Sequence, residues 1–76
     1  MIIYVLMVQD RHTDPQSYVF DTLEAAIAAA RQLAQAARRT AYYVEEPIAG
    51  WLFHACYSVE GDAVWVVAKE LNAPPA

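Results

Sequence analysis

The chain has 76 residues, nine acidic and five basic, which give a formal net charge of −4 at pH 7. A chain of this length forms one domain that buries only roughly 60% of its unfolded surface, so its stability is marginal without further support. Its one cysteine, Cys56, excludes an intrachain disulfide. A single thiol suits a reducing compartment, which favours a cytoplasmic location. The excess of acidic charge argues against direct, non-specific binding of DNA or RNA, because clustered Lys and Arg supply affinity for phosphate.

The apolar opening, residues 1–8, is too short to span a membrane and has neither a cationic leader nor a small-residue cleavage site. We therefore expect no signal peptide and no membrane contact. Residues 2–9 are nearly continuously apolar and rich in β-branched types, which predicts a central strand covered on both faces. The polar, proline-containing loop at residues 10–16 then predicts a short antiparallel second strand at residues 17–20.

The longest periodic stretch, residues 21–39, predicts an amphipathic helix, because apolar residues recur every three or four positions. Asp21 and Glu24 have the spacing of a capping box at the first turn. Arg38 and Arg39 suit the last turn, where cations interact favourably with the helix dipole. The apolar side is mostly alanine, so we expect the helix to lie close against a surface of larger side chains.

Residues 40–50 leave three alternatives open: they prolong the helix, form a short strand or cross the end of the sheet. A proline and a glycine end any regular element within this segment. The alternation of residues 51–59 predicts a third strand, with Trp51 favoured as a core side chain. A tight turn at residues 60–62 then leads into a fourth strand at residues 63–71, paired with the third as a hairpin.

These elements predict an α+β fold of ββαββ order, a four-stranded antiparallel sheet with one helix packed on one face. We expect the strand order 2-1-3-4, because the helix then returns the chain so that the third strand runs antiparallel beside the first. Residues 1–71 form the single domain, and residues 72–76 form a disordered tail.

Two apolar surfaces remain uncovered in this arrangement. The fourth strand is an apolar edge strand with little charge to protect it. The sheet face without the helix exposes part of a large apolar set, and we expect one of these surfaces to be a homodimer or partner interface. The set consists of Ile3, Val5, Met7, Trp65 and Val67, or of the alternate residues of the same strands.

His54 and Cys56 are candidate metal ligands, because they lie two positions apart on a predicted strand and point to one face. A soft metal there would need Asp10 or His12 to complete its shell. Structural zinc usually needs four ligands, so we favour a packed histidine and cysteine without metal. The loop at residues 10–14 gathers acid–base residues, yet no phosphate loop, nucleophile motif or cysteine pair supplies a reaction. We expect no catalytic residue, no metal and no cofactor.

Three small acidic groups lie in the predicted loops. If folding brings two of them to one edge, their spaced carboxylates resemble a phosphate backbone and suit a basic groove meant for DNA. The alternative is that acidic turns keep a small apolar domain soluble. The residues predicted as partner contacts are Asp10, Asp14, Glu45, Glu46, Glu60 and Asp62.

Two stretches, IIYVLMVQDRHTDP at residues 2–15 and WLFHACYSVEGDAVWVV at residues 51–67, look like a group of small, mostly uncharacterised bacterial proteins with a similar opening strand and EGD hairpin. In size, acidity, element order and lack of catalytic motifs, the chain also resembles the small anti-CRISPR proteins of phages and mobile elements, particularly inhibitors of type I surveillance complexes. This second resemblance is one of kind, so it transfers no functional residue by position. It implies a non-enzymatic inhibitor that binds a Cas subunit where target DNA is read.

Three hypotheses follow for function. The first is a non-enzymatic inhibitor, a DNA mimic that binds a basic nucleic-acid-binding protein through the acidic residues. The second is a small dimeric regulatory or oligomerisation domain in which Trp65 loses solvent access. The third is a small enzyme or metal protein, which requires His12, His54 and Cys56 to converge in one pocket.

Overall fold

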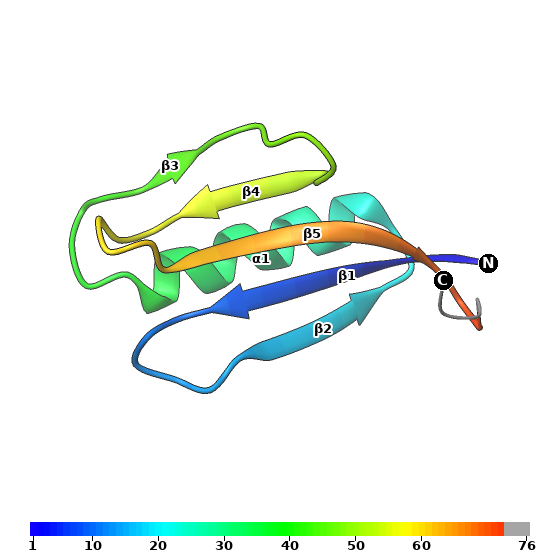
Figure 1. The fold of residues 1–76 in the computed structure, drawn as a ribbon, viewed down its shortest axis with the longest axis horizontal. Helices are drawn as coiled ribbons and strands as arrows, with labels where there is room; N and C mark the ends of the chain where they lie inside the picture. Colours follow the sequence, from blue (N-terminus) through cyan, green and yellow to red (C-terminus); the bar gives the residue numbers. More distant parts are fainter. Residues whose placement is uncertain (73–76) are drawn as a thin grey trace.

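The computed structural model describes residues 1–72 as a five-stranded antiparallel sheet with one α-helix behind it (Figure 1). The predicted α+β class, with the helix on one face, is confirmed. The prediction of four strands is wrong, because two residues after the helix pair with β4 as a further strand. The elements are β1 (Ile2–Gln9), β2 (Gln16–Phe20), α1 (Leu23–Ala37), β3 (Val44–Glu45), β4 (Phe53–Cys56) and β5 (Ala63–Glu70).

The strands lie in the order β2-β1-β5-β4-β3, so the predicted order 2-1-3-4 is wrong. β5 pairs with β1 along its whole length, from Ile2 opposite Glu70 to Gln9 opposite Ala63. Both strands have eight residues and are largely apolar, and strands of this kind bury both faces at the centre of a sheet. β4 has only four residues and lies one position further out. The prediction of an apolar edge at residues 63–71 is therefore also wrong.

The helix is shorter than predicted at both ends. Thr22 is its N-cap, with an extended backbone and a hydroxyl that accepts a hydrogen bond from the Ala25 N–H at 3.2 Å. The predicted N-cap, Asp21, is wrong by one residue, because the hydroxyl oxygen of Thr22 is the one that reaches the Ala25 N–H. The helix ends at Ala37 and Arg38 is extended, so the predicted basic last turn is also wrong. Within residues 1–72, no helix is long and apolar enough to cross a membrane.

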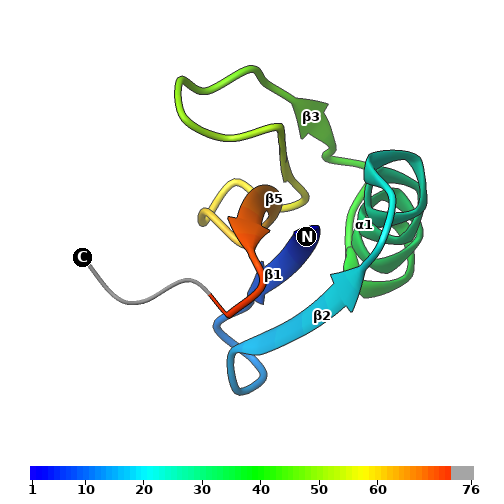
Figure 2. The same ribbon diagram turned by 90° about the vertical axis from the view of Figure 1, so that its right-hand side faces the viewer.

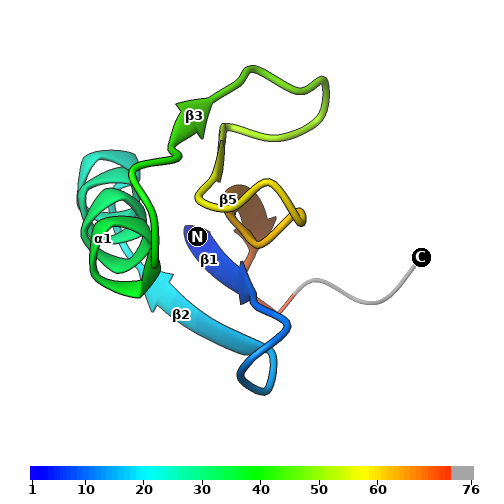
Figure 3. The same ribbon diagram turned by 90° about the vertical axis from the view of Figure 1, so that its left-hand side faces the viewer.

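The core lies between α1 and one face of the sheet (Figures 2 and 3). Every fully buried side chain of α1 is an alanine, which confirms the predicted alanine face and lets the helix lie close to the sheet. The sheet and the loop after β4 supply the larger core side chains. The buried alanines are Ala26, Ala30 and Ala34, and they face a surface that includes Leu6, Tyr57, Val64 and Val66.

The segment predicted as the third strand keeps its alternation only in the middle. Ala55 and Tyr57 are buried toward α1, whereas His54 lies on the opposite face. Val59 is 81% exposed, because the chain has left the sheet before this position. After the helix, residues 44–45 take the short-strand alternative. Residues 73–76, most of the predicted disordered tail, lie outside the described residues.

Candidate functional site

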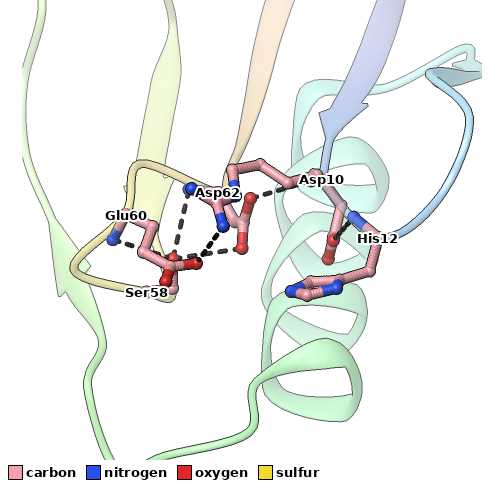
Figure 4. Close-up of polar contacts among 6 residues, drawn as sticks. Asp10, His12, Ser58, Glu60 and Asp62 are labelled. Atoms are coloured by element: carbon pink, nitrogen blue, oxygen red, sulfur yellow. Dashed lines mark hydrogen bonds and ion pairs between the residues drawn. The ribbon is translucent and has the colours of Figure 1, made fainter.

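Polar side chains from two loops meet at one end of the sheet, where β1 and β4 end and β5 begins (Figure 4). The loop after β1 supplies Asp10 and His12, and the loop between β4 and β5 supplies Tyr57, Ser58 and Asp62. We call these five residues the loop cluster. Asp10 and Asp62 meet because they flank the last residue pair of the β1–β5 ladder.

Asp10 is the buried anion of the loop cluster, with 8% of its surface exposed. Its Oδ2 accepts a hydrogen bond from the Tyr57 hydroxyl at 2.7 Å, and its Oδ1 accepts one from the His12 N–H at 2.8 Å. The Tyr57 hydrogen bond, followed by the His12 N–H, lowers the pKa of Asp10 below its ordinary 3.8. Burial, followed by this same hydrogen bond, raises the pKa of Tyr57. At neutral pH the pair is therefore a carboxylate and a neutral phenol.

Asp62 is the second buried carboxylate, with 3% exposed. Its Oδ1 accepts a hydrogen bond from the Arg11 N–H at 2.9 Å, and its Oδ2 accepts one from the Ser58 hydroxyl at 3.1 Å. Gly61 has φ of +99°, which lets the loop turn back so that Ser58 reaches Asp62. A depression of about 260 Å³ opens beside the loop cluster, lined in part by His12, Arg39, Tyr57, Ser58, Glu60 and Asp62.

Four of the six predicted partner contacts come to this end of the sheet, from the two loops described above. Asp10 and Asp62 are buried, and their carboxylate oxygens already accept internal hydrogen bonds. Glu60 pairs with Arg11 at 3.1 Å. Asp14 is exposed, and its side chain has no hydrogen bond or ion pair within the described residues.

The other two predicted contacts lie away from the loop cluster, at the sheet edge formed by β3. Glu45 is the last residue of β3, and Glu46 follows it. Glu45 accepts two hydrogen bonds from Arg31 of α1, at 2.8 and 2.9 Å, and one from the Tyr43 hydroxyl at 2.7 Å. The Arg31 and Tyr43 bonds lower the pKa of Glu45 to about 2. Glu45 thus fastens β3 to the helix. Glu46 is exposed, and in the described chain its carboxylate has no such partner.

The sheet face opposite α1 is largely apolar, and no described helix lies over it (Figures 2 and 3). The ladder places Met7 opposite Trp65 and Val5 opposite Val67, all half-buried, so the exposed set is the first of the two predicted alternatives. Val19, which pairs with Val5 on the same face, is 62% exposed. We call this surface the open face, formed by Ile3, Val5, Met7, Val19, Trp51, His54, Cys56, Trp65 and Val67.

Trp51 belongs to the open face, so the preference for it as a core residue is wrong. It is 38% exposed, and its ring stacks on Trp65 with centroids 5.0 Å apart and planes 14° apart. Its ring centre also lies 5.5 Å from that of His54. Trp51 leaves the core because β4 begins at Phe53. The paired indoles form a large aromatic surface, a type enriched in binding hot spots.

His54 and Cys56 are neighbours on the open face, with Nε2 and Sγ 3.8 Å apart. The His54 Nδ1 is buried and has no hydrogen-bond partner in residues 1–72. A metal at Nε2 would require the proton on Nδ1, where it would find no acceptor. Burial, with the charge of Glu46, raises the pKa of the Cys56 thiol, which therefore stays protonated at neutral pH.

The third hypothesis requires His12 to join His54 and Cys56, and this arrangement is not observed. His12 lies instead with Asp10 and Asp62, which is the only group of three metal-ligand side chains within the described residues. Within the described residues, the convergence of His12, His54 and Cys56 that the third hypothesis requires is therefore absent.

Sequence reasoning missed Tyr57 and Ser58 as members of the loop cluster. Ser58 had a local signal, since a serine four residues before Asp62 in a glycine-containing loop is typical of a side-chain-closed turn. Tyr57 had none, because it meets Asp10 across 47 residues of chain.

Comparisons with protein-family models, with curated proteins and with solved structures found no match.

Proposed function

We propose that this protein works by protein–protein contact, without catalysis, as a small dimer-forming regulatory or oligomerisation domain. The observation that carries this proposal is the open face, a contiguous apolar surface with a stacked tryptophan pair on the side of the sheet that α1 leaves bare. A domain of this size is marginal by itself, and covering such a face supplies further buried apolar area.

A second copy of the chain is the partner that the open face suits. The centre of the open face consists of uncharged apolar side chains, and Lys69, which pairs with Ile3 on the same face, lies near the end of the β1–β5 ladder. Two copies related by a twofold axis can therefore pack face to face without placing like charges opposite one another. Each Trp51–Trp65 pair then lies against apolar strand residues of the other copy.

The size of the face sets the expected strength. The four strands β2, β1, β5 and β4 have 5, 8, 8 and 4 residues. With about 3.3 Å per residue and about 4.8 Å between strands, they give roughly 400 Å² per copy. Two such faces total roughly 800 Å², below the roughly 1,000 Å² of a stable specific interface. We therefore expect a weak dimer with a dissociation constant of about 100 µM.

Sedimentation velocity between about 1 and 300 µM tests this proposal. We expect the sedimentation coefficient to rise from monomer to dimer over that range. Val67→Glu places a charge in the open face and should weaken association at least about tenfold. The control is Gln35→Glu, which adds the same charge on the exposed side of α1. A monomer at every concentration, or equal association of the two variants, would reject the dimer.

The acidic inhibitor of a basic partner, such as a Cas subunit, stays a second candidate. It is favoured by the gathering of Asp10, Asp14, Glu60 and Asp62 at one end of the sheet. Among the predicted contacts, Asp14 and Glu46 have exposed carboxylates without a partner in residues 1–72, so these two residues are the ones to mutate. Reversing both to lysine should abolish capture of the basic partner and its sensitivity to salt, whereas Val67→Glu should leave both unchanged. The reverse pattern would assign binding to the open face.

A further inference from the structure

We propose that Asp10, His12 and Asp62 form a binding site for a divalent metal ion of the zinc or manganese type. One ligand atom from each of the three side chains lies within 4.8 Å of the other two. The three residues come from the two loops that meet at the end of the sheet (Figure 4). This site is separate from the open face and does not depend on dimer formation.

The charge of the site is the first argument for a cation. Asp10 and Asp62 are 8% and 3% exposed, and neither is in an ion pair within the described residues. The cations close by are Arg39, which lines the depression, and Arg11, whose guanidinium is paired with Glu60. A bound divalent ion would neutralise the charge of these two buried carboxylates.

The hydrogen bonds of the site are the second argument. Tyr57 donates to one carboxylate and Ser58 to the other, while two backbone N–H groups hold the remaining oxygens. Each oxygen keeps a second lone pair, so these bonds orient the carboxylates without preventing coordination. Ligating carboxylates in metal sites are held by such outer hydrogen bonds.

His12 supplies a nitrogen ligand, which purely acidic loops lack. Its imidazole is exposed, lies beside the two carboxylates and lines the depression, so it can turn toward an ion from the solvent side (Figure 4). Two carboxylates and one imidazole suit Zn²⁺ or Mn²⁺ better than Mg²⁺ or Ca²⁺, which prefer oxygen ligands alone. Three protein ligands leave at least one coordination position for water.

Titration of the metal-free chain with ZnCl₂ by calorimetry, and with MnCl₂ by electron paramagnetic resonance, tests the proposal. We expect saturable binding of one ion per chain, with a dissociation constant below about 100 µM for at least one of the two metals. The bound metal should also raise the thermal midpoint, because it binds the folded chain. Failure of both metals to bind saturably up to about 1 mM would overturn the proposal.

His12→Ala is the decisive variant, because this side chain is exposed and its removal leaves the buried hydrogen bonds in place. It should weaken binding of the metal at least about tenfold. Asp14→Asn is the matched control, since it removes an exposed charge from the same loop and should leave the affinity unchanged. Equal affinities of the two variants, or Mg²⁺ competing as well as Zn²⁺, would show general attraction to acidic loops and overturn the site.

Discussion

At the scale of single residues, the contact between Asp10 and Tyr57 closes one end of the sheet. The Tyr57 side chain is part of the core, with 1% exposed, and its hydroxyl donates to a carboxylate from a distant loop. A buried phenol without an acceptor is costly, so this one hydrogen bond specifies how the two loops meet. The same hydrogen bond is the main cause of the lowered pKa of Asp10.

Asp10→Ala should lower the free energy of unfolding by about 1–3 kcal/mol, because it leaves the buried Tyr57 hydroxyl without a partner. Urea denaturation at pH 7 measures the change. Asp14→Ala in the same loop is the control and should lie within about 0.5 kcal/mol of the wild type. Equal effects of both substitutions would contradict the role given to the hydrogen bond.

The pH dependence of this stabilisation follows from the lowered pKa of Asp10. Above the ordinary value of 3.8 the carboxylate is ionised in the folded and the unfolded chain, and the full contribution is present. Below 3.8 the unfolded chain takes up the proton first, so the contribution is lost as the pH falls through the folded-state pKa. The difference in urea midpoint between the wild type and Asp10→Ala should therefore shrink below about pH 4. A difference that stays constant down to pH 2.5 would contradict the assignment.

At the scale of elements, α1 packs against one face of the sheet and holds its strands in place. Its alanines bring the helix backbone close to β1 and β5, while Arg31 holds the edge strand β3 through Glu45. Neither of these contacts faces the surfaces proposed for function. The helix therefore acts as scaffold, and its contribution is to leave one sheet face bare and the loop cluster at one end.

The close approach of α1 can be tested by enlarging one alanine. Ala30→Leu inserts three carbon atoms into a fully buried position and should destabilise the fold by about 1–3 kcal/mol. Ala28→Leu makes the same change on the exposed side of the same helix and should stay within about 0.5 kcal/mol of the wild type. Thermal or urea unfolding measures both variants, and comparable stability of the two would show that the interface has room to spare.

At the scale of the whole molecule, the sheet separates two surfaces of different chemistry. The open face is apolar except for Lys69 near its end, whereas the loop cluster at the end of the sheet is polar and anionic. Because these surfaces share no residue, dimer formation and metal binding can be changed one at a time. The order of the strands produces this separation, since it places β5 at the centre and both loops at the same end.

Coupling between folding and association gives a prediction for the whole chain. If the open face pairs with a second copy, the thermal midpoint should rise with protein concentration above the dissociation constant. Scanning calorimetry of the wild type between about 10 and 300 µM should show this rise, whereas Val67→Glu should keep a constant midpoint. A concentration-independent midpoint in the wild type would argue against a stabilising dimer.

Local pattern in the sequence determined most of the elements. The apolar run of β1, the polar loop after it and the alanine-rich helix were predictable because each depends on residues close together in the chain. The partial exposure of one alternating set of sheet residues was also predictable, since one helix covers only one face of a sheet, but the sequence left open which set this is. The short strand β3 was harder to predict from the sequence, because two residues show no periodicity.

The tertiary structure alone decided the strand order, the place of Trp51 and the loop cluster. Each of these depends on pairing between distant segments, and alternation within one strand does not identify its neighbour. β5 joins β1 because pairing the two long apolar strands covers the most surface, and that pairing brings Asp62 beside Asp10. The sequence by itself thus determined which segments form strands and helix, while the competition among strands for the central positions decided where the candidate sites lie.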